Sequence, residues 1–397
     1  MSNTAAEARA VEKGTAVAPP VKTKERLLAL DVFRGMTLVA MTVVNMPGDE
    51  HFTYAPLAHV RWNGWTIADL IFPFFIFIVG VAIPYSFAGR LARGESKGKL
   101  VTHILLRTVV LFAVGVFMNW YTNYMSGLPR YHLANIRIFG TLQRIALCYF
   151  FASLLYLKFK ARGLAIISTV ILVLHFILLK FVPVPGHGVA VLGRDGNWVQ
   201  FIDLHVMAGH LASRTWESKG FLGTFPALAN MLLGVLAGMY FRSSRSAMEK
   251  VRSFLVMGNL GLLLGLVWSI WFPINQNLWT GSLVLFMSGM ALVILACCYY
   301  LADVRKITWW TKPFVIFGVN SLFLWVVGGD VSSMTNLDAI WISQANGTQV
   351  SLRTLIYNAF ASWVGPVHGS ELYALVWVTL WFGILAVMYK KRIFIKI

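Results

Sequence analysis

The chain consists of long apolar runs separated by short polar segments. Ten of these runs approach the roughly 20 apolar residues that a helix needs to cross the hydrocarbon core of a bilayer. The expected spans lie at about 27–46, 65–88, 101–121, 138–158, 163–181, 221–241, 251–272, 280–301, 313–329 and 371–389. The pattern therefore predicts an all-α fold, a polytopic integral membrane helical bundle of about ten transmembrane helices.

Composition and charge agree with this prediction. Of the 397 residues 58% are hydrophobic and only 13% are charged, whereas soluble domains carry about 25% charged residues. The net charge is +18, but with a cytoplasmic N-terminus the cytoplasmic segments hold 23 Lys and Arg and the outer loops hold 7. The positive-inside rule requires such an asymmetry, which predicts that both termini are cytoplasmic. The basic surplus thus favours contact with anionic membrane lipid over nucleic-acid binding.

The N-terminal residues differ in composition from the rest of the chain. Residues 1–24 are polar, rich in alanine and include Pro19 and Pro20, which predicts a disordered cytoplasmic tail. Because they lack an apolar signal-peptide core, we expect the first span to be retained. Residues 25–397 are expected to form a single transmembrane domain.

The three cysteines fall within spans and outside metal-ligand spacing, so we expect no metal site. The glycine-rich segment 258–261 suits close helix packing and also allows a homodimer face.

Ionisable and amide side chains gather around the first two spans. Asp31 and Arg34 are three residues apart on one face of the first span, which ends at Asn45. His59 lies in the following loop, and Asp69 lies in the first turn of the second span. Charges inside a span are costly, roughly 2.5–3.5 kcal/mol on insertion scales, so they usually serve a function. An imidazole can act as a general base near neutral pH, and a carboxylate can orient it.

Each of these residues also has a structural interpretation. The histidine could cap a helix or sit at the membrane interface, and Asp69 suits the positive end of a helix dipole. Asn45 suits a helix C-terminus. Asp31 and Arg34 suit an internal ion pair.

Several patches occur in a characteristic order along the chain. They are DVFRG at 31–35, VNMPG at 44–48, AHVRWNGWTIADLIFPFFIFIVG at 58–80, LQRIALCY at 142–149, GFLGTFPA at 220–227, NLWTGSLVL at 277–285 and FGVNSLFLWV at 317–326. Together they closely resemble the heparan-α-glucosaminide N-acetyltransferase family of transmembrane acetyltransferases. The animal family members have a large luminal domain without a counterpart here, which suggests a short, bacterial-type member in the cytoplasmic (inner) membrane.

The resemblance implies transfer of acetyl from acetyl-CoA, as co-substrate, to the amine of an amino sugar such as glucosamine or an envelope oligosaccharide. The family's catalytic histidine falls on His59, with Asp69 and Asn45 as supporting candidates. His59 would act either as general base or as acetyl carrier. Arg34 becomes a candidate for the CoA phosphates, and Asp31 beside it a candidate residue of the same cofactor site. Arg34 and Asn45 are about 16 Å apart along a helix, a distance that suits an extended pantetheine arm reaching toward His59.

Further polar residues within or beside the spans extend the predicted site. Additional candidates for CoA are His103, Arg107, Gln143 and Arg144. Candidates for the sugar are Trp62, Asn63, Trp279 and Asn320. Ser321 is a further pocket candidate beside Asn320. Interhelical hydrogen bonding explains the candidates on spans, Trp279, Asn320 and Ser321, equally well. Residues 351–364 are predicted to form an interfacial or re-entrant helix.

Two other functions fit part of the pattern. A permease for N-acetylglucosamine-type sugars would also use many spans, aromatic loops and polar groups in the membrane. A flippase or structural component of envelope synthesis would need neither CoA nor solute uptake. The outer histidine together with basic residues on the inner side favours the acetyltransferase.

Overall fold

The computed structural model describes residues 27–125, 132, 134–328, 337–343 and 348–395, so the predicted tail 1–24 lies outside the described residues. In chain order the elements are α2 (Leu28–Asn45), η1 (Glu50–Phe52), α3 (Ile67–Leu91), α4 (Lys97–Met125), α5 (Thr141–Lys158), α6 (Ala161–Phe181), α7 (Trp198–Val206), α8 (Thr224–Phe241), α9 (Ala247–Ser269), α10 (Gly281–Cys298), η3 (Tyr299–Val304), α11 (Thr311–Val319), α12 (Ser321–Phe323), η4 (Leu324–Gly328), β1 (Trp341–Ser343), β2 (Gln349–Ser351), α14 (Leu352–Val364) and α15 (Pro366–Lys390).

The all-α, polytopic architecture predicted from the apolar runs is confirmed. Within the described residues, eight helices are long and apolar enough to cross a membrane, and the bent pair Thr311–Val319 and Ser321–Gly328 makes a ninth if it is one span. Ten were predicted. The predicted span that fails this test is 138–158, which forms α5. Its polar Gln143 and Arg144 are 1% and 0% exposed, so they face the bundle rather than lipid.

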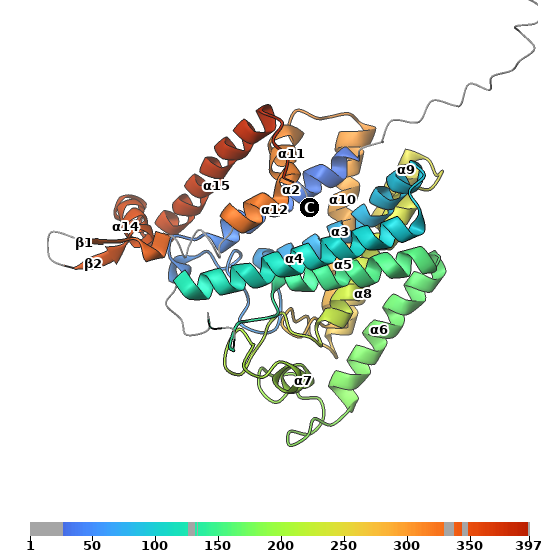
Figure 1. Ribbon diagram of the computed structural model, residues 1–397, viewed down its shortest axis with the longest axis horizontal. Helices are drawn as coiled ribbons and strands as arrows, with labels where there is room; N and C mark the ends of the chain where they lie inside the picture. Colours follow the sequence, from blue (N-terminus) through green and yellow to red (C-terminus); the bar gives the residue numbers. More distant parts are fainter. Residues whose placement is uncertain (1–26, 126–131, 133, 329–336, 344–347, 396–397) are drawn as a thin grey trace, which may run out of the picture.

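Burial separates central from peripheral helices. α3, α8 and α10 have about two thirds or more of their apolar windows buried, whereas α4, α6, α9 and α15 have less than a third buried. α3 packs on α8, α10 on α9, α11 on α2 and α4 on α5. Figure 1 shows α4 and α5 side by side, with α6 diverging from them. The peripheral helices therefore present most of their apolar surface to lipid.

Glycines allow the central helices to touch backbone to backbone. A Cβ atom added to Gly80 of α3 would lie 2.1 Å from the carbonyl oxygen of Met231 in α8. The glycine-rich segment 258–261 does the same against α10, because a Cβ on Gly258 would lie 2.9 Å from the carbonyl oxygen of Gly289. This face of α9 is therefore used within the chain.

The predicted span 313–329 is broken at Asn320. The two parts meet at 71°, and Asn320 itself is neither α-helical nor extended, with φ −112° and ψ 41°. Nearby, β1 and β2 form a small antiparallel hairpin in which Ile342 pairs with Val350. The hairpin leads into α14, the helix predicted at 351–364, which packs on α15 and lies at one end of the molecule (Figure 1).

Candidate active site

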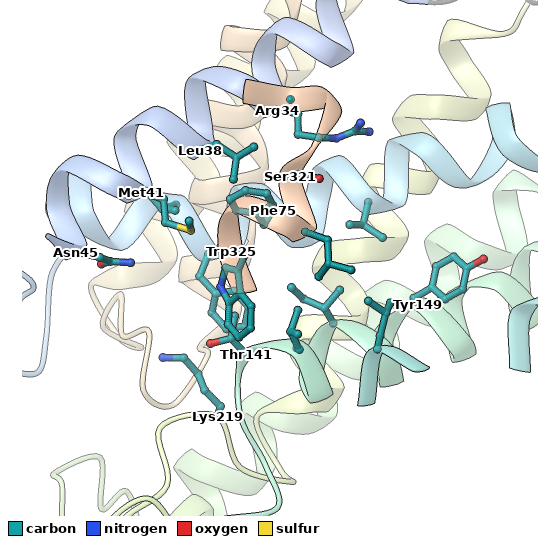
Figure 2. A pocket seen from close by; sticks show the side chains of 18 of the residues that line it. Arg34, Leu38, Met41, Asn45, Phe75, Thr141, Tyr149, Lys219, Ser321 and Trp325 are labelled. Atoms are coloured by element: carbon teal, nitrogen blue, oxygen red, sulfur yellow. The ribbon is translucent and has the colours of Figure 1, made fainter. Parts of the chain in front are cut away.

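A cavity of about 530 Å³ lies between α2, α3, α4, α5 and the break that separates α11 from α12. Figure 2 shows Arg34 at one end of this cavity, Asn45 and Lys219 at the other, and Leu38 and Met41 along α2 between them. We call these the inner end and the outer end. Other lining residues are His59, Phe72, Phe75, Arg107, Thr141, Tyr149, Gln276, Ser321, Trp325 and Ile395.

His59 and Asp69 form a pair at the outer end. The imidazole Nδ1 of His59 lies 2.7 Å from Oδ1 of Asp69. The His59 side chain is 54% exposed, whereas that of Asp69 is only 2% exposed. Because an ionised carboxylate only accepts hydrogen bonds, Nδ1 donates its proton and Nε2 keeps a free lone pair. The pair therefore presents an imidazole that can take a proton.

The turn before α3 fixes the Asp69 carboxylate. Its second oxygen, Oδ2, accepts hydrogen bonds from the backbone N–H of Thr66 at 3.0 Å and of Val60 at 3.2 Å. Thr66 is the N-cap residue of α3 and shares a capping box with Asp69, which explains why the sequence begins a helix here. The positive end of the helix dipole also favours a carboxylate at this position. Asp69 is thus held rigidly behind His59.

Two further polar groups complete the outer end. Asn45 is the last residue of α2, and Lys219 comes from the loop before α8 (Figure 2). Burial, together with the smaller effect of the Arg144 and Arg137 charges, lowers the pKa of Lys219 to about 8. No ion pair between described side chains includes Lys219. The outer end therefore combines a base with a partly buried cation.

A buried ion pair positions the backbone of Lys219. Arg137 donates to both oxygens of the Glu217 carboxylate, at 2.6 and 2.9 Å. The same carboxylate accepts the backbone N–H of Lys219 at 2.9 Å and that of Ala212 at 2.9 Å. Glu217 is 1% exposed, so removal of the Arg137 charge would leave a carboxylate unpaired in the interior.

Arg144 and Asp203 fix the residues that follow. Arg144 donates from Nη2 to the carbonyl oxygen of Gly220 at 3.0 Å, and Oδ1 of Asp203 accepts the backbone N–H of Phe221 at 2.9 Å. Burial raises the pKa of the Asp203 carboxyl to about 7. These contacts hold the segment from which Lys219 enters the cavity.

The inner end is basic. Arg34 pairs with Asp31 at 3.7 Å, and the guanidinium of Arg107 lies 4.8 Å from the ring centre of Tyr149. Both arginines line the cavity. Along α2, Arg34 and Asn45 are eleven residues apart, about 16 Å at the helical rise. One cavity therefore joins a basic end to the histidine end over a length suited to an extended chain-like ligand.

The structure does not bring every predicted CoA residue to the wall of this cavity. Asp31 reaches it only through Arg34. The ring Nε2 of His103 lies 2.8 Å from Nη2 of Arg90. Gln143 and Arg144 are buried on α5 outside the lining.

The predicted sugar residues also have other partners. Trp62 donates from its indole to the carbonyl oxygen of Leu192 at 2.8 Å, and Asn63 accepts from Asn275 at 3.0 Å. Trp279 is fully buried beneath Arg144, 5.1 Å from its guanidinium. Asn320 is hydrogen-bonded to the C-terminal segment. None of the four lines the cavity, and their roles in sugar binding stay predictions.

Comparison with known proteins identifies the family. A sequence model described as "Heparan-alpha-glucosaminide N-acetyltransferase, catalytic" matches residues 26–270. The chain belongs to this family. The protein named heparan-alpha-glucosaminide N-acetyltransferase from Mus musculus is 30% identical over 424 residues, which cover 94% of this chain. The protein of the same name from Homo sapiens is 30% identical over 353 residues, which cover 76% of this chain.

The resemblance predicted from the sequence patches is thereby confirmed. This chain spans 60% of the length of the mouse protein and 52% of the human one. The family assignment therefore covers the membrane domain, and the activity in the relatives' names does not pass to this chain by similarity alone.

In this member of the N-acetyltransferase family, several cavity residues were not predicted. Lys219 directly precedes the GFLGTFPA patch and Gln276 directly precedes NLWTGSLVL. Their proximity to these patches was the available signal. Ile395 carried no signal, because an isoleucine after a basic run does not distinguish a cavity residue from an ordinary tail.

Proposed function

We propose that the protein is an integral-membrane N-acetyltransferase that moves acetyl from acetyl-CoA to the amine of an amino sugar. The observation that carries this proposal is the single cavity that joins Arg34 and Arg107 to the His59–Asp69 pair. The basic end suits phosphates, and the apolar wall formed by Leu38 and Met41 of α2 suits the pantetheine arm. The cavity volume of about 530 Å³ lies within the range of about 300–1,000 Å³ typical of small-molecule sites.

His59 is proposed as the base. It takes a proton from the amine through Nε2 as the nitrogen attacks the thioester carbonyl carbon. The C–N bond forms, the C–S bond breaks, and the proton returned by His59 converts the thiolate to a free thiol. Asp69 stabilises the charged imidazole, and the Asn45 amide and the Lys219 ammonium supply donors for the carbonyl oxygen. In a second route Nε2 attacks the thioester first and carries the acetyl group to the amine.

The proposed orientation places the inner end in the cytoplasm. The asymmetry of 23 basic residues against 7 supports this orientation, with both termini cytoplasmic. Acetyl-CoA would then enter from the cytosol while the acceptor approaches His59 from the other side. The location is proposed to be the bacterial cytoplasmic membrane.

The test is thiol release by the purified protein in detergent. With acetyl-CoA and glucosamine, we expect continuous release of free CoA thiol that requires the sugar. A single-turnover burst without sugar would select the acetyl-histidine route. Absence of turnover, together with absence of thermal stabilisation by CoA, would overturn the proposal.

One observation also suits the alternative, a sugar permease. The helix broken at Asn320 lines the cavity, and broken helices are common at the binding sites of transporters. Uptake of labelled N-acetylglucosamine into proteoliposomes without any acyl donor would favour this alternative.

A further inference from the structure

The segment after α15 returns to the cavity. The helix ends at Lys390, and residues 391–395, here called the C-terminal strap, turn back so that Ile395 lines the inner end. Tyr389 and Phe394 face each other with ring centres 6.1 Å apart. The side chains of Ile393, Phe394 and Ile395 are nevertheless 39–46% exposed. Apolar packing therefore does not account for the position of the strap.

Asn320 holds the strap in place. Its side-chain Nδ2 donates to the carbonyl oxygen of Ile393 at 3.0 Å, and its Oδ1 accepts the backbone N–H of Ile395 at 2.9 Å. The amide thus pairs with two backbone groups as a neighbouring strand would. Asn320 is itself fully buried and lies at the helix break, directly before the cavity residue Ser321. This latch couples the strap to the wall of the cavity.

The turn into the strap has an unexpected residue. The backbone N–H of Ile393 bonds to the carbonyl of Met388, and that of Arg392 bonds to Tyr389, which is the pattern of a Schellman motif. The left-handed position of this motif, with φ +58°, is occupied by Arg392. Glycine adopts this conformation without the steric cost that other residues incur. A strained arginine at this position points to a role for its charge.

The charges around the strap suit a polyanion. Lys390, Lys391 and Arg392 follow one another in the sequence, and Arg34 and Arg107 line the same end of the cavity. We propose that the strap and the inner end together bind the 3′-phosphorylated ADP part of CoA, with Asn320 as the positioning residue. This inference rests on the proposed function and adds the cytoplasmic half of its donor site.

The test compares two donors that differ only in the nucleotide. Acetyl-CoA carries the phosphates, whereas S-acetylpantetheine carries the same thioester and arm without them. Arg392→Gly removes the charge and relieves the strained backbone, so it should fold at least as well as the wild type. We expect this variant to raise KM for acetyl-CoA about tenfold, the value of one hydrogen bond to a charged group, without changing KM for S-acetylpantetheine.

Asn320→Ala should have the same donor-selective effect, because the strap loses both of its hydrogen bonds to the Asn320 side chain. Asn259→Ala is the matched control, since Asn259 on the exposed face of α9 bonds only to its own helix, at the carbonyl of Leu255. We expect this control to behave like the wild type with both donors. KM for the sugar acceptor should not change in Arg392→Gly or in Asn259→Ala.

The possible failures are distinguishable. If the wild type uses neither donor, the proposed acetyltransferase function is wrong and the strap inference falls with it. If the wild type uses both donors but Arg392→Gly and Asn320→Ala affect them equally, or not at all, the function stands and the inference is overturned.

Discussion

Asp69→Asn tests the geometry at His59 directly. The asparagine amide can be placed in two ways. If its nitrogen replaces Oδ2, this NH2 group faces the backbone N–H groups of Val60 and Thr66. Those two backbone donors then lose their acceptor. If its nitrogen replaces Oδ1, those two bonds survive, but the amide donates to His59 Nδ1. The second placement is favoured, and it forces the ring proton onto Nε2, the nitrogen that is proposed to accept a proton from the amine.

The two backbone hydrogen bonds to position 69 determine the size of the rate loss in Asp69→Asn. Restoring the active tautomer requires the amide to flip, which leaves two part-buried backbone donors without an acceptor, at up to about 1–3 kcal/mol each. The active tautomer is then disfavoured by roughly 2–6 kcal/mol, equivalent to a rate loss of roughly 30-fold to 10⁴-fold. His59→Ala removes the base altogether and should cost roughly 10²-fold to 10⁴-fold.

The assay is kcat/KM for glucosamine, measured from thiol release with saturating acetyl-CoA. The same loop supplies a matched control pair, because His51 Nδ1 lies 3.0 Å from Asp49 Oδ1 and neither residue lines the cavity. His51→Ala and Asp49→Asn should leave kcat/KM within about twofold, as surface substitutions usually do. Activity of Asp69→Asn within threefold of the wild type, or equal losses in the two histidine variants, would refute the reasoning.

Three further predictions concern packing and charge. Gly35→Ala should lower the thermal midpoint in detergent severely, because a Cβ there would lie 1.8 Å from the carbonyl oxygen of Phe314. Gly383→Ala is the control, because a Cβ at Gly383 would meet nothing within 4 Å. This control should stabilise α15 by up to about 1 kcal/mol. The folded Asp203 carboxyl has a pKa of about 7 against the ordinary 3.8, so the folded state binds more protons between these values. Stability should therefore fall as pH rises from 4 to 7, by at most roughly 4 kcal/mol, and Asp203→Asn should flatten that slope in a thermal-shift series. Lys219, with a pKa of about 8 against 10.5, should hold roughly 300-fold more neutral amine at pH 7 than an ordinary lysine. It should therefore be acylated by acetic anhydride faster than a lysine of equal access, by up to that factor, as measured by peptide mass spectrometry. An ordinary rate would contradict the lowered pKa.

The sequence predicted what depends on composition and short-range spacing. Apolar runs predicted the helices, because a bilayer demands length and hydrophobicity and little else. The pairing of His59 with Asp69 was one of two interpretations open for Asp69, because both residues lie within one loop and the helix turn that follows it. The structure brings them within hydrogen-bonding distance.

Contacts between segments that are distant in the sequence could not be predicted from it. A span that is apolar on all sides gives no periodic signal for its inward face, so the sequence did not reveal that Arg107 lines the cavity whereas Arg144 does not. Lys219 enters the cavity because Arg137, Arg144 and Asp203 hold its loop from three separate elements. No local pattern encodes that arrangement.

The break at Asn320 connects packing to the proposed chemistry. Before the break, α2 and α11 touch backbone to backbone, since a Cβ on Gly318 would lie 2.6 Å from the carbonyl oxygen of Asp31. After the break the chain turns by 71°, so Ser321 and Trp325 face the space that opens beside α2 (Figure 2). Interrupted backbone at membrane depth is tolerated only where protein or a cavity satisfies its polar groups. At the break the Asn320 carbonyl accepts the backbone N–H of Leu324 at 3.0 Å. The Asn320 side chain binds the strap, so the residue at the break that opens the cavity also fixes its inner end. A substitution that separates α2 from α11 should therefore weaken donor binding as well as stability.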